Sequence, residues 1–235
     1  MNGHNGIEII GNIVADPTSK TYGAGKTLVE VNIAVNNKAS KTKTAQYFKA
    51  TAFAGLGDVF TKYTKRGSSV RISARIRVRQ YVDKNGNKRQ AAELVINDML
   101  LLGDGSNAGV NNASLIGNLV NDPEVTTLAN GTSKAKFRLA INNARRKEDP
   151  ADYIDVVLFD KQAEAAAKIL KKGKGVYVIG RLEARTYERK DGTKGDAVEI
   201  VAERFQILGN KNAIKATEKA VAAGVQDLDN EEIPF

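Results

Sequence analysis

The chain of 235 residues carries 36 Lys and Arg against 27 Asp and Glu, for a formal net charge of +9, and it contains no Cys and a single His, His4. This composition excludes disulfide bonds, thiolate catalysis, Cys/His zinc sites and histidine-based triads. No export signal opens the chain and no apolar run of about 18 residues occurs, so we expect a cytoplasmic protein without a membrane partner.

The charge is unevenly distributed along the chain. Residues 7–102 hold 16 basic and 7 acidic side chains, residues 113–208 hold 17 and 14, and the last ten residues hold four acids and no base. A basic body indicates a polyanionic partner, with nucleic acid as the first candidate, although the same surplus also serves solubility. The acidic end indicates a separate role.

The first elements of the chain are short strands. Residues 1–6 are a predicted flexible leader, and residues 7–14 form an apolar run that predicts a strand buried on both faces. Asp16-Pro17 ends this strand because Pro cannot donate to a ladder, which makes Asp16 most simply a turn residue, and Asp122 of the second copy likewise. A loop is expected over 18–26, followed by a half-buried strand of alternating apolar residues over 29–35.

Three more strands and one helix complete the pattern. We expect a basic polar loop over 36–45 and then, in order, strand 46–53, helix 54–66, strand 70–81 and strand 91–102. Gly67 is expected to end the helix, and Asn85-Gly86 to form the hairpin turn between the last two strands. Three strands, a helix and two strands is the layout of an OB-fold, a small five-stranded Greek-key barrel.

The chain contains this pattern twice. The segment IIGNIVADP at 9–17 recurs as LIGNLVNDP at 115–123, and at this offset of 106 about 29 of roughly 96 paired residues are identical, without a gap. We therefore predict an all-β fold with one short helix per domain, made of two tandem OB-fold barrels. The predicted limits are a leader over 1–6, OB-fold 1 over 7–102, a linker over 103–112, OB-fold 2 over 113–208 and a C-terminal tail over 209–235.

Residues two apart on a strand share a face, which places aromatic and charged side chains together on the outer surface of both domains. One outer face is predicted to carry Tyr47, Lys49, Thr51 and Phe53, and its counterpart Tyr153, Asp155, Val157 and Phe159. Rings stack on bases for roughly 1–3 kcal/mol each, and guanidinium groups pair with phosphates. The predicted stacking residues are Tyr47, Phe53, Tyr81, Tyr153, Phe159 and Tyr187, and the predicted phosphate contacts are Lys49, Arg71, Arg75, Arg77, Arg79, Arg181 and Arg185.

The two copies differ in charge on this face. The second copy has Asp155 where the first has Lys49, and Glu183 where the first has Arg77, so we predict that the first copy supplies most of the phosphate affinity. Two simpler interpretations stay open. Outward Tyr residues are common in strands, and a row of Arg residues also protects a sheet edge.

Catalytic motifs are missing from the sequence. It has no clustered carboxylates suited to two metals, no glycine-rich loop leading into GK[ST], and no GxSxG. We therefore expect a protein that is not an enzyme and that has no cofactor or metal.

These segments together resemble the bacterial single-stranded DNA-binding protein (SSB) family. The resemblance is carried by SLIGNLVNDPEV at 114–125, YIDVVLF at 153–159, YFKATAF at 47–53, KGKGVYVIGRL at 172–182 and DLDNEEIPF at 227–235. Two barrels in one chain are similar to the SSBs of the Deinococcus–Thermus group. The chain departs from the family in having no Trp, so that Tyr stands where the family has indoles.

The resemblance implies a function and partners. It implies sequence-independent binding and protection of single-stranded DNA in replication, recombination and repair, by a homodimer with four OB-folds, in the cytoplasm at the nucleoid. It also implies that the basic contact before the third ring falls on Arg79 and Arg185. The alternatives are an RNA-binding OB-fold protein, and a scaffold in which one barrel serves only for dimerisation.

The C-terminal tip is expected to act as a docking peptide. Its carboxylates would attract basic pockets and its apolar end would fill a hydrophobic pocket. The resemblance implies that these pockets belong to DNA replication, recombination and repair proteins. The residues expected to do this are Asp227, Asp229, Glu231, Glu232, Ile233, Pro234 and Phe235. The simpler interpretation is a solubilising acidic tail.

Overall fold

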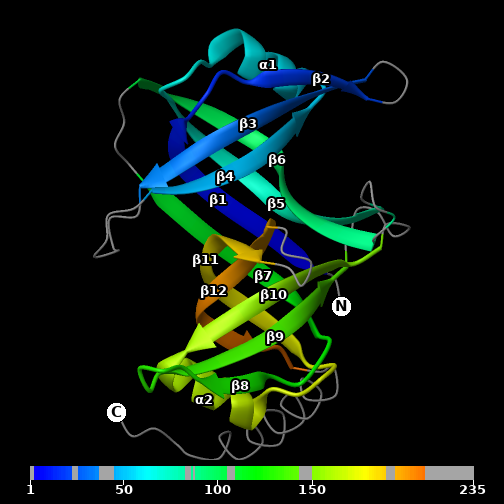
Figure 1. Ribbon diagram of the computed structural model, residues 1–235, viewed down its shortest axis with the longest axis vertical. Coiled ribbons are helices and arrows are strands. Elements are labelled where there is room, and N and C mark those ends of the chain that lie inside the picture. The colour runs from blue at the N-terminus through cyan, green and yellow to red at the C-terminus, as the bar shows by residue number, and fades with distance from the viewer. Residues whose placement is uncertain are drawn as a thin grey trace, which may run out of the picture.

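The computed structural model describes the backbone of residues 3–22, 26–36, 45–82, 86, 88–104, 109–142, 150–188 and 194–209. Within these ranges it describes every side chain except those of residues 22, 26, 79–82, 88–91, 104, 185–188 and 194–197. The described part forms two barrels stacked along the long axis of the molecule (Figure 1). We refer to residues 4–104 as barrel 1 and to residues 110–207 as barrel 2.

Both barrels are built from the same series of elements. Barrel 1 contains β1 (His4–Ile13), β2 (Thr18–Tyr22), β3 (Lys26–Asn36), β4 (Ala45–Phe53), α1 (Gly55–Tyr63), β5 (Ser68–Val82) and β6 (Lys88–Asp104). Barrel 2 contains β7 (Val110–Leu119), β8 (Glu124–Thr127), β9 (Ser133–Ile141), β10 (Asp152–Phe159), α2 (Asp160–Ile169), β11 (Gly175–Glu188) and β12 (Lys194–Ile207). The repeat in the sequence is therefore a repeat of structure, and the predicted all-β fold of two tandem OB-fold barrels is confirmed.

One twelve-stranded sheet runs through both barrels. Its order is β2-β3-β4-β6-β5-β1-β7-β11-β12-β10-β9-β8, and the further pairings of β1 with β3 and of β7 with β9 close each barrel. β4 pairs with β6 in parallel, and β10 with β12. β1 and β7 join the two barrels as antiparallel neighbours, from His4 opposite Ile116 to Ile10 opposite Val110.

The inward side chains of the strands fill each barrel. On β5 every second residue from Val70 to Ile76 is buried, because successive Cβ atoms point to opposite faces of the sheet. α1 adds the fully buried ring of Phe60 to barrel 1, and α2 adds Ala163 and Ala166 to barrel 2. Full burial of one Phe ring contributes roughly 1.5–3 kcal/mol. The two helices lie at opposite ends of the molecule (Figure 1).

The Asp-Pro pair of each repeat fastens the first strand of a barrel to the turn after its helix. Asp16 Oδ1 accepts a hydrogen bond from the backbone N–H of Arg66 at 2.8 Å, and Asp122 Oδ1 accepts one from the backbone N–H of Lys172 at 2.7 Å. That backbone hydrogen bond, helped by the Lys171 side chain, holds the pKa of Asp122 below its usual value. Both carboxylates are turn residues, as predicted.

The observed limits of the strands differ from the predicted ones. Part of the expected loop 18–26 is the edge strand β2, which pairs with β3, and β8 is its counterpart in barrel 2. Residues 4–6 of the expected leader belong to β1. Of the expected linker, residues 103–104 belong to β6 and residues 110–112 to β7. β1 and β7 are longer because they pair with each other over this length, which a single domain viewed alone does not suggest, whereas residues 103–104 of β6 pair with the start of β5.

β1 is buried on one face only, whereas the sequence predicted burial on both. Ile7, Ile9 and Ile13 point into the core, while Glu8 and Ile10 on the outer face are half-buried. The side chains on the outer face are partly covered because β1 has a neighbouring strand on each side, β5 and β7. They stay partly exposed because no further layer of described residues covers this face of the sheet.

Helix α1 also ends earlier than predicted. It stops at Tyr63, because Thr64 is extended and its hydroxyl donates to the carbonyl of Phe60 at 2.7 Å. Gly67, with φ of +93°, does not end the helix but forms the turn into β5. Only Gly adopts this backbone conformation without strain.

Two asparagines complete the ladders at the junction of the barrels. Asn5 on β1 accepts from the N–H of Ile76 at 3.0 Å and donates to the carbonyl of the same residue at 2.7 Å. Asn111 on β7 makes the same two hydrogen bonds to Leu182, at 2.9 Å and 2.8 Å. Each side-chain amide thus stands in for a peptide group at the point where β1 or β7 leaves its own barrel for the other.

Candidate nucleic-acid interface

Two tyrosines present their rings to solvent at matching places in the two barrels. Tyr47 on β4 is 62% exposed, and Tyr153 on β10 is 47% exposed. The residue directly across the ladder is Ala34 for Tyr47 and Ala140 for Tyr153. Because Ala covers little of a neighbouring ring, a face of each phenol stays open to a stacking partner.

A phenylalanine ends the same strand in both barrels. Phe53 and Phe159 are half-buried, and both lie on the outer face with the tyrosines. Lys134 lies directly opposite Phe159 on β9, and its ammonium is 6.0 Å from the centroid of that ring. Barrel 2 therefore offers a ring and a cation side by side, which suits a base and its phosphate.

In each barrel one residue between the Tyr and the Phe of this strand is buried, although it was expected on the outer face. The sequence predicted Thr51 and Val157 to be outward, but their exposed fractions are 6% and 0%. Each lies opposite a Val in the parallel ladder, Val95 or Val201, and these neighbours are buried as well. The open part of each face thus consists of a Tyr, a charged residue and a Phe.

Barrel 1 carries a cluster of one acid and two bases beside its aromatics, which we call cluster 1. Glu30 on β3 lies 2.6 Å from Lys20 Nζ on β2 and 3.0 Å from Lys49 Nζ on β4. The hydrogen bond from Lys20, together with that from Lys49, holds the pKa of Glu30 below its usual value although burial opposes this. The side chains of both lysines are more than half exposed, which leaves them accessible to a phosphate.

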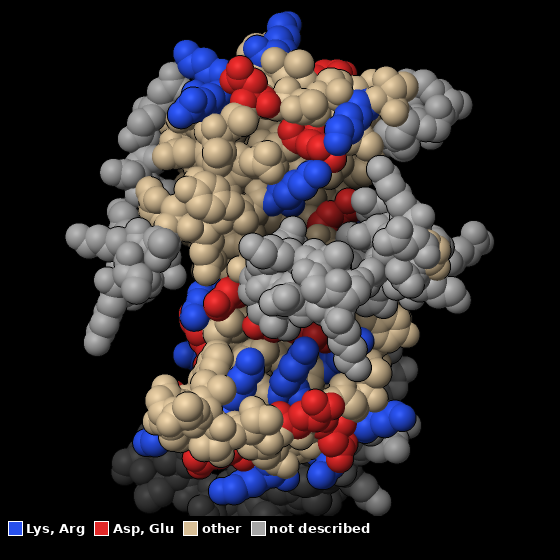
Figure 2. Space-filling view, in the orientation of Figure 1, with Lys and Arg blue, Asp and Glu red and all other residues tan. Residues whose placement is uncertain are grey.

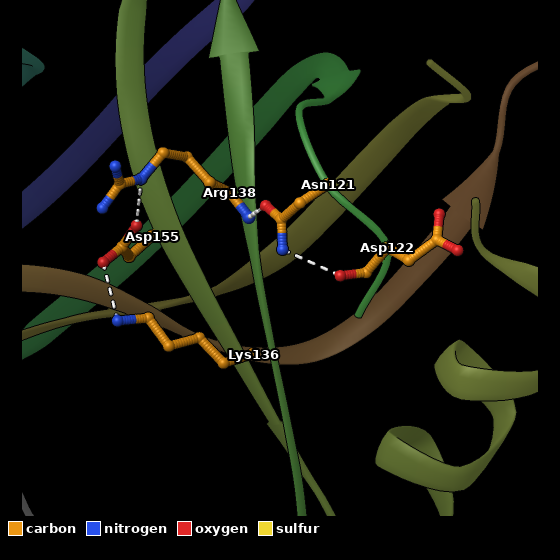
Figure 3. Close-up of polar contacts among 5 residues, drawn as sticks. All are labelled: Asn121, Asp122, Lys136, Arg138 and Asp155. Carbon is orange, nitrogen blue, oxygen red and sulfur yellow. Dashed lines mark hydrogen bonds and ion pairs between the residues drawn. The ribbon is translucent and has the colours of Figure 1, made fainter. Parts of the chain in front are cut away.

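Barrel 2 carries a cluster of the same charge, which we call cluster 2. Asp155 on β10 accepts from Arg138 Nε at 2.6 Å through Oδ1, and Lys136 Nζ lies 2.9 Å from its Oδ2 (Figure 3). Burial by itself raises the pKa of Asp155, yet the hydrogen bonds and charges of Arg138 and Lys136 outweigh it and leave the pKa below its usual value. The same hydrogen bond raises the pKa of Arg138.

The two clusters occupy equivalent places with the charges exchanged. At the offset of 106, Glu30 corresponds to Lys136 and Lys49 to Asp155. Each cluster holds two bases and one acid. The contrast between Lys49 and Asp155 is therefore offset locally by the neighbouring strand, and it does not by itself make the face of barrel 2 less positive.

Two predicted phosphate contacts on β5, Arg71 and Arg75, lie in ion pairs. Arg71 Nε lies 2.7 Å from Glu8 Oε1 on β1. Arg75 Nη1 lies 4.0 Å from Asp152 of barrel 2, whose Oδ1 also accepts from the N–H of Val78 at 3.1 Å. In the free protein Arg75 therefore takes part in the junction between the barrels, and Arg71 ties β5 to β1.

The other described members of the Arg row differ in their surroundings. Arg77 is exposed and makes no ion pair with another residue whose side chain is described. Arg181 reaches Glu183 at 3.8 Å and Glu203 at 3.9 Å, while its Nε is buried with no hydrogen-bond partner among the described residues. Among the described members of this row, Arg71, Arg75 and Arg181 lie in ion pairs, whereas no described acid pairs with Arg77.

The third predicted ring of each barrel is described only by its backbone. Tyr81 lies in β5 opposite Arg89 of β6, and Tyr187 lies in β11 opposite Gly195 of β12, so each belongs to the long hairpin of its barrel. Their side chains, and those of Arg79 and Arg185, lie outside the described residues, as do Asp227, Asp229, Glu231, Glu232, Ile233, Pro234 and Phe235. Predictions for these residues stay predictions.

Sequence reasoning missed four cations at this face, namely Lys20, Lys134, Lys136 and Arg138. Three of them alternate along β9, and the register places them opposite Phe159, Val157 and Asp155 in turn. The alternation was visible in the sequence, but its meaning depends on knowing which strand lies beside β9. Lys20 lies on β2, a segment that the sequence predicts to be a loop.

The described surface is mixed in charge. Figure 2 shows acidic and basic side chains close together on both barrels in this view, with no continuous basic band. Within the part of the chain that is described, no three His, Cys, Asp or Glu side chains gather in a way that could hold a metal ion. None of the described helices is long and apolar enough to cross a membrane.

Comparison with known proteins identifies relatives for both barrels. The family model described as the single-strand binding protein family matches residues 4–102 and again residues 110–208. The "Single-stranded DNA-binding protein 2" of Clostridium acetobutylicum is 38% identical over 133 residues, which is 54% of this chain and 100% of that protein. A "Single-stranded DNA-binding protein" of Staphylococcus aureus is 40% identical over 107 residues, covering 44% of this chain and 69% of that one.

A solved structure matches the fold over most of the chain. The wild-type single-stranded DNA-binding protein from Thermus aquaticus superposes with a TM-score of 0.73 at 22% identity, covering 89% of this chain and 95% of the other. At this identity the likeness shows the fold, and it extends over both barrels.

Proposed function

The chain belongs to the single-strand binding protein family, and from this premise we propose that it binds single-stranded DNA without regard to sequence and does no catalysis. Bases would stack on Tyr47 and Phe53 in barrel 1 and on Tyr153 and Phe159 in barrel 2, while neighbouring Lys and Arg side chains meet the phosphates. Such a mode tolerates any sequence, because every base has a π-face and every nucleotide a phosphate.

One observation carries this proposal. Both barrels present an open Tyr ring, 62% and 47% exposed, on a face that also holds two bases of a charge cluster. A single exposed ring is common on a protein surface, but finding one at equivalent positions of both barrels, each beside two bases, favours a ligand with flat bases and negative charge. The names of the relatives support DNA as that ligand.

The stacking role is tested by single substitutions with a matched control. Tyr47→Ala and Tyr153→Ala should each weaken binding of a labelled oligo(dT), measured by fluorescence anisotropy, by roughly 1–3 kcal/mol. Tyr63→Ala is the control, because Tyr63 is 57% exposed and even has the ammonium of Lys62 at 5.1 Å, but lies on α1 at the end of barrel 1. Equal effects of all three changes would contradict the proposal, and so would failure of the unaltered protein to bind.

The nucleic-acid class is tested by competition. Binding to oligo(dT) should be displaced more readily by poly(dT) than by poly(U). A preference for poly(U) would instead support an RNA-binding OB-fold protein, because only the 2′-OH and the base methyl distinguish the two polymers.

We further propose that the protein acts as a homodimer with four barrels, in replication, recombination and repair. The acidic residues and Ile-Pro-Phe at 227–235 support a docking role for that segment. Deleting 227–235 should abolish capture of repair and replication proteins while leaving oligo(dT) affinity equal or higher. Light scattering that gives the mass of one chain, near 25.3 kDa, would contradict the dimer.

A further inference from the structure

Asp155 lies at the centre of the proposed DNA-binding face of barrel 2. It belongs to the same face of β10 as Tyr153 and Phe159, about 7 Å along the strand from the first and about 13 Å from the second. A nucleotide chain that stacks on both rings has to pass over this position. The inference below rests on the proposed function, since it assumes that single-stranded DNA takes this path.

The carboxylate is paired on both of its oxygens. Arg138 Nε holds Oδ1 at 2.6 Å and Lys136 Nζ lies 2.9 Å from Oδ2 (Figure 3). Two acceptor oxygens facing an Arg and a Lys are the arrangement that a phosphate group would take at the same place. The side chain of Asp155 is 20% exposed, whereas those of Lys136 and Arg138 are 37% and 45% exposed, so a phosphate has access to the cations.

The position of Arg138 is fixed from the other side as well. Its backbone N–H donates to Asn121 Oδ1 at 3.2 Å, and Asn121 Nδ2 donates to the carbonyl of Asp122 at 2.8 Å (Figure 3). The backbone at Arg138 is therefore anchored at the closure of barrel 2, and its planar guanidinium aligns with the carboxylate directly across the ladder. This is a more rigid pairing than in cluster 1, where two lysines on flexible stems hold Glu30.

We propose that Asp155 is an internal competitor for phosphate, which occupies Lys136 and Arg138 in the free protein and thereby weakens DNA binding by barrel 2. A phosphate that binds there replaces the Asp155 carboxylate at Lys136 and Arg138. Its binding therefore releases fewer solution counterions than binding to two cations that were unpaired before. Asp155 thus sets both the affinity of barrel 2 and its dependence on salt.

The test is Asp155→Asn in the full-length chain, with oligo(dT) binding measured over a range of salt concentrations. All proteins carry Tyr47→Ala, so that barrel 2 dominates the signal. Removing the carboxylate should tighten binding by at least about threefold at moderate salt. It should also steepen the slope of log K against log salt by up to about 1.4. Two protein cations become available to phosphates, and each phosphate contact adds about 0.7 to the slope for a single strand.

Glu164→Gln provides the matched control. Glu164 is exposed on α2, away from the proposed face, and its substitution changes the net charge by the same amount. The inference is overturned if Asp155→Asn and Glu164→Gln give the same affinity and the same slope. It is also overturned if Asp155→Asn binds oligo(dT) more weakly, which would make Asp155 a residue that positions Arg138. If the unaltered protein fails to bind oligo(dT), the proposed function itself falls.

A second variant keeps the inference testable if Asp155→Asn alters folding. With Asp155 present, in the Tyr47→Ala background, Lys136→Ala should weaken binding by less than one full phosphate contact, because Asp155 occupies Lys136 in the free protein. In the Asp155→Asn background the same change should cost distinctly more, about the loss of one phosphate contact, visible as a slope lower by about 0.7. Equal costs in the two backgrounds overturn the competition, and circular dichroism and thermal melting establish that each variant is folded.

Discussion

Replacing Asn5 by Ala should destabilise the junction between the two barrels. The side-chain amide of Asn5 makes two hydrogen bonds to the backbone of Ile76, at 3.0 Å and 2.7 Å, at the place where β1 leaves β5 for β7. Ala keeps the strand but removes both partners. The N–H and the carbonyl of Ile76 then face the junction unpaired. Ile76 is itself only 1% exposed.

The magnitude follows from those two bonds. An intramolecular hydrogen bond contributes about 1 kcal/mol net, and a polar group left unpaired in a part-buried place costs about 1–3 kcal/mol. We therefore expect Asn5→Ala to lower the free energy of unfolding by about 2–4 kcal/mol. For a chain of 150–250 residues 1 kcal/mol corresponds to roughly 2–4 °C, so the thermal midpoint should fall by about 4–16 °C.

The assay is urea unfolding followed by circular dichroism, with two comparison variants. Asn111→Ala removes the same two bonds from Leu182, at 2.9 Å and 2.8 Å, and should have an effect of similar size. Asn112→Ala is the control, because Asn112 is the exposed neighbour on the same strand. The reasoning is refuted if Asn5→Ala and Asn112→Ala differ by less than about 0.5 kcal/mol, the spread expected at ordinary surface positions.

Three further changes test the packing and the charges. Phe60→Ala should cost about 3–5 kcal/mol in urea unfolding, because the ring is fully buried in barrel 1, and a loss below 1 kcal/mol would contradict that burial. Gly117→Ala should cost about 1–3 kcal/mol, since its Cβ would lie 2.7 Å from the carbonyl oxygen of Ala140, whereas Gly55→Ala, with open space around the added Cβ, should not destabilise. Finally, the lowered pKa values of Glu30 and Asp155 mean that their stabilisation is complete above the unfolded pKa values of about 4 and is lost as the pH falls through the folded ones. The melting temperature should therefore decrease below about pH 4, and Asp155→Asn should make that decrease shallower; an unchanged pH profile would contradict the ion pairs of cluster 2.

The repeat and five of the six strands in each barrel could be predicted from the sequence because they depend on local patterns. Alternating apolar residues gave the buried face of β5, and the offset of 106 gave the second barrel. The same alternation predicted that Tyr47 and Tyr153 point outward, which their exposure bears out. The predicted exposure of Thr51 and Val157 was wrong. Each lies on the outer face by alternation, but it lies opposite a buried Val in the parallel ladder and is buried with it.

The charge clusters could not be predicted from the same patterns. Arg138 and Asp155 are 17 residues apart, and Arg75 and Asp152 are 77 residues apart, so which of them meet depends on the register between strands. In the sequence, Asp155 is the acid that occupies in the second repeat the position that Lys49 has in the first. In the structure it is an acid that holds two cations missed by the sequence, and this changes the expected behaviour of barrel 2.

By itself, the sequence determined that this protein is two copies of one five-stranded barrel with aromatic and basic side chains outward. Periodicity of two along a strand encodes which side chains share a face, and it needs no knowledge of neighbouring strands. Only the tertiary structure decided that β1 and β7 fuse the barrels into one sheet, that Arg75 serves their junction, and that Asp155 occupies Lys136 and Arg138. These depend on pairings between segments distant in the chain, where geometry rather than local composition selects the partners.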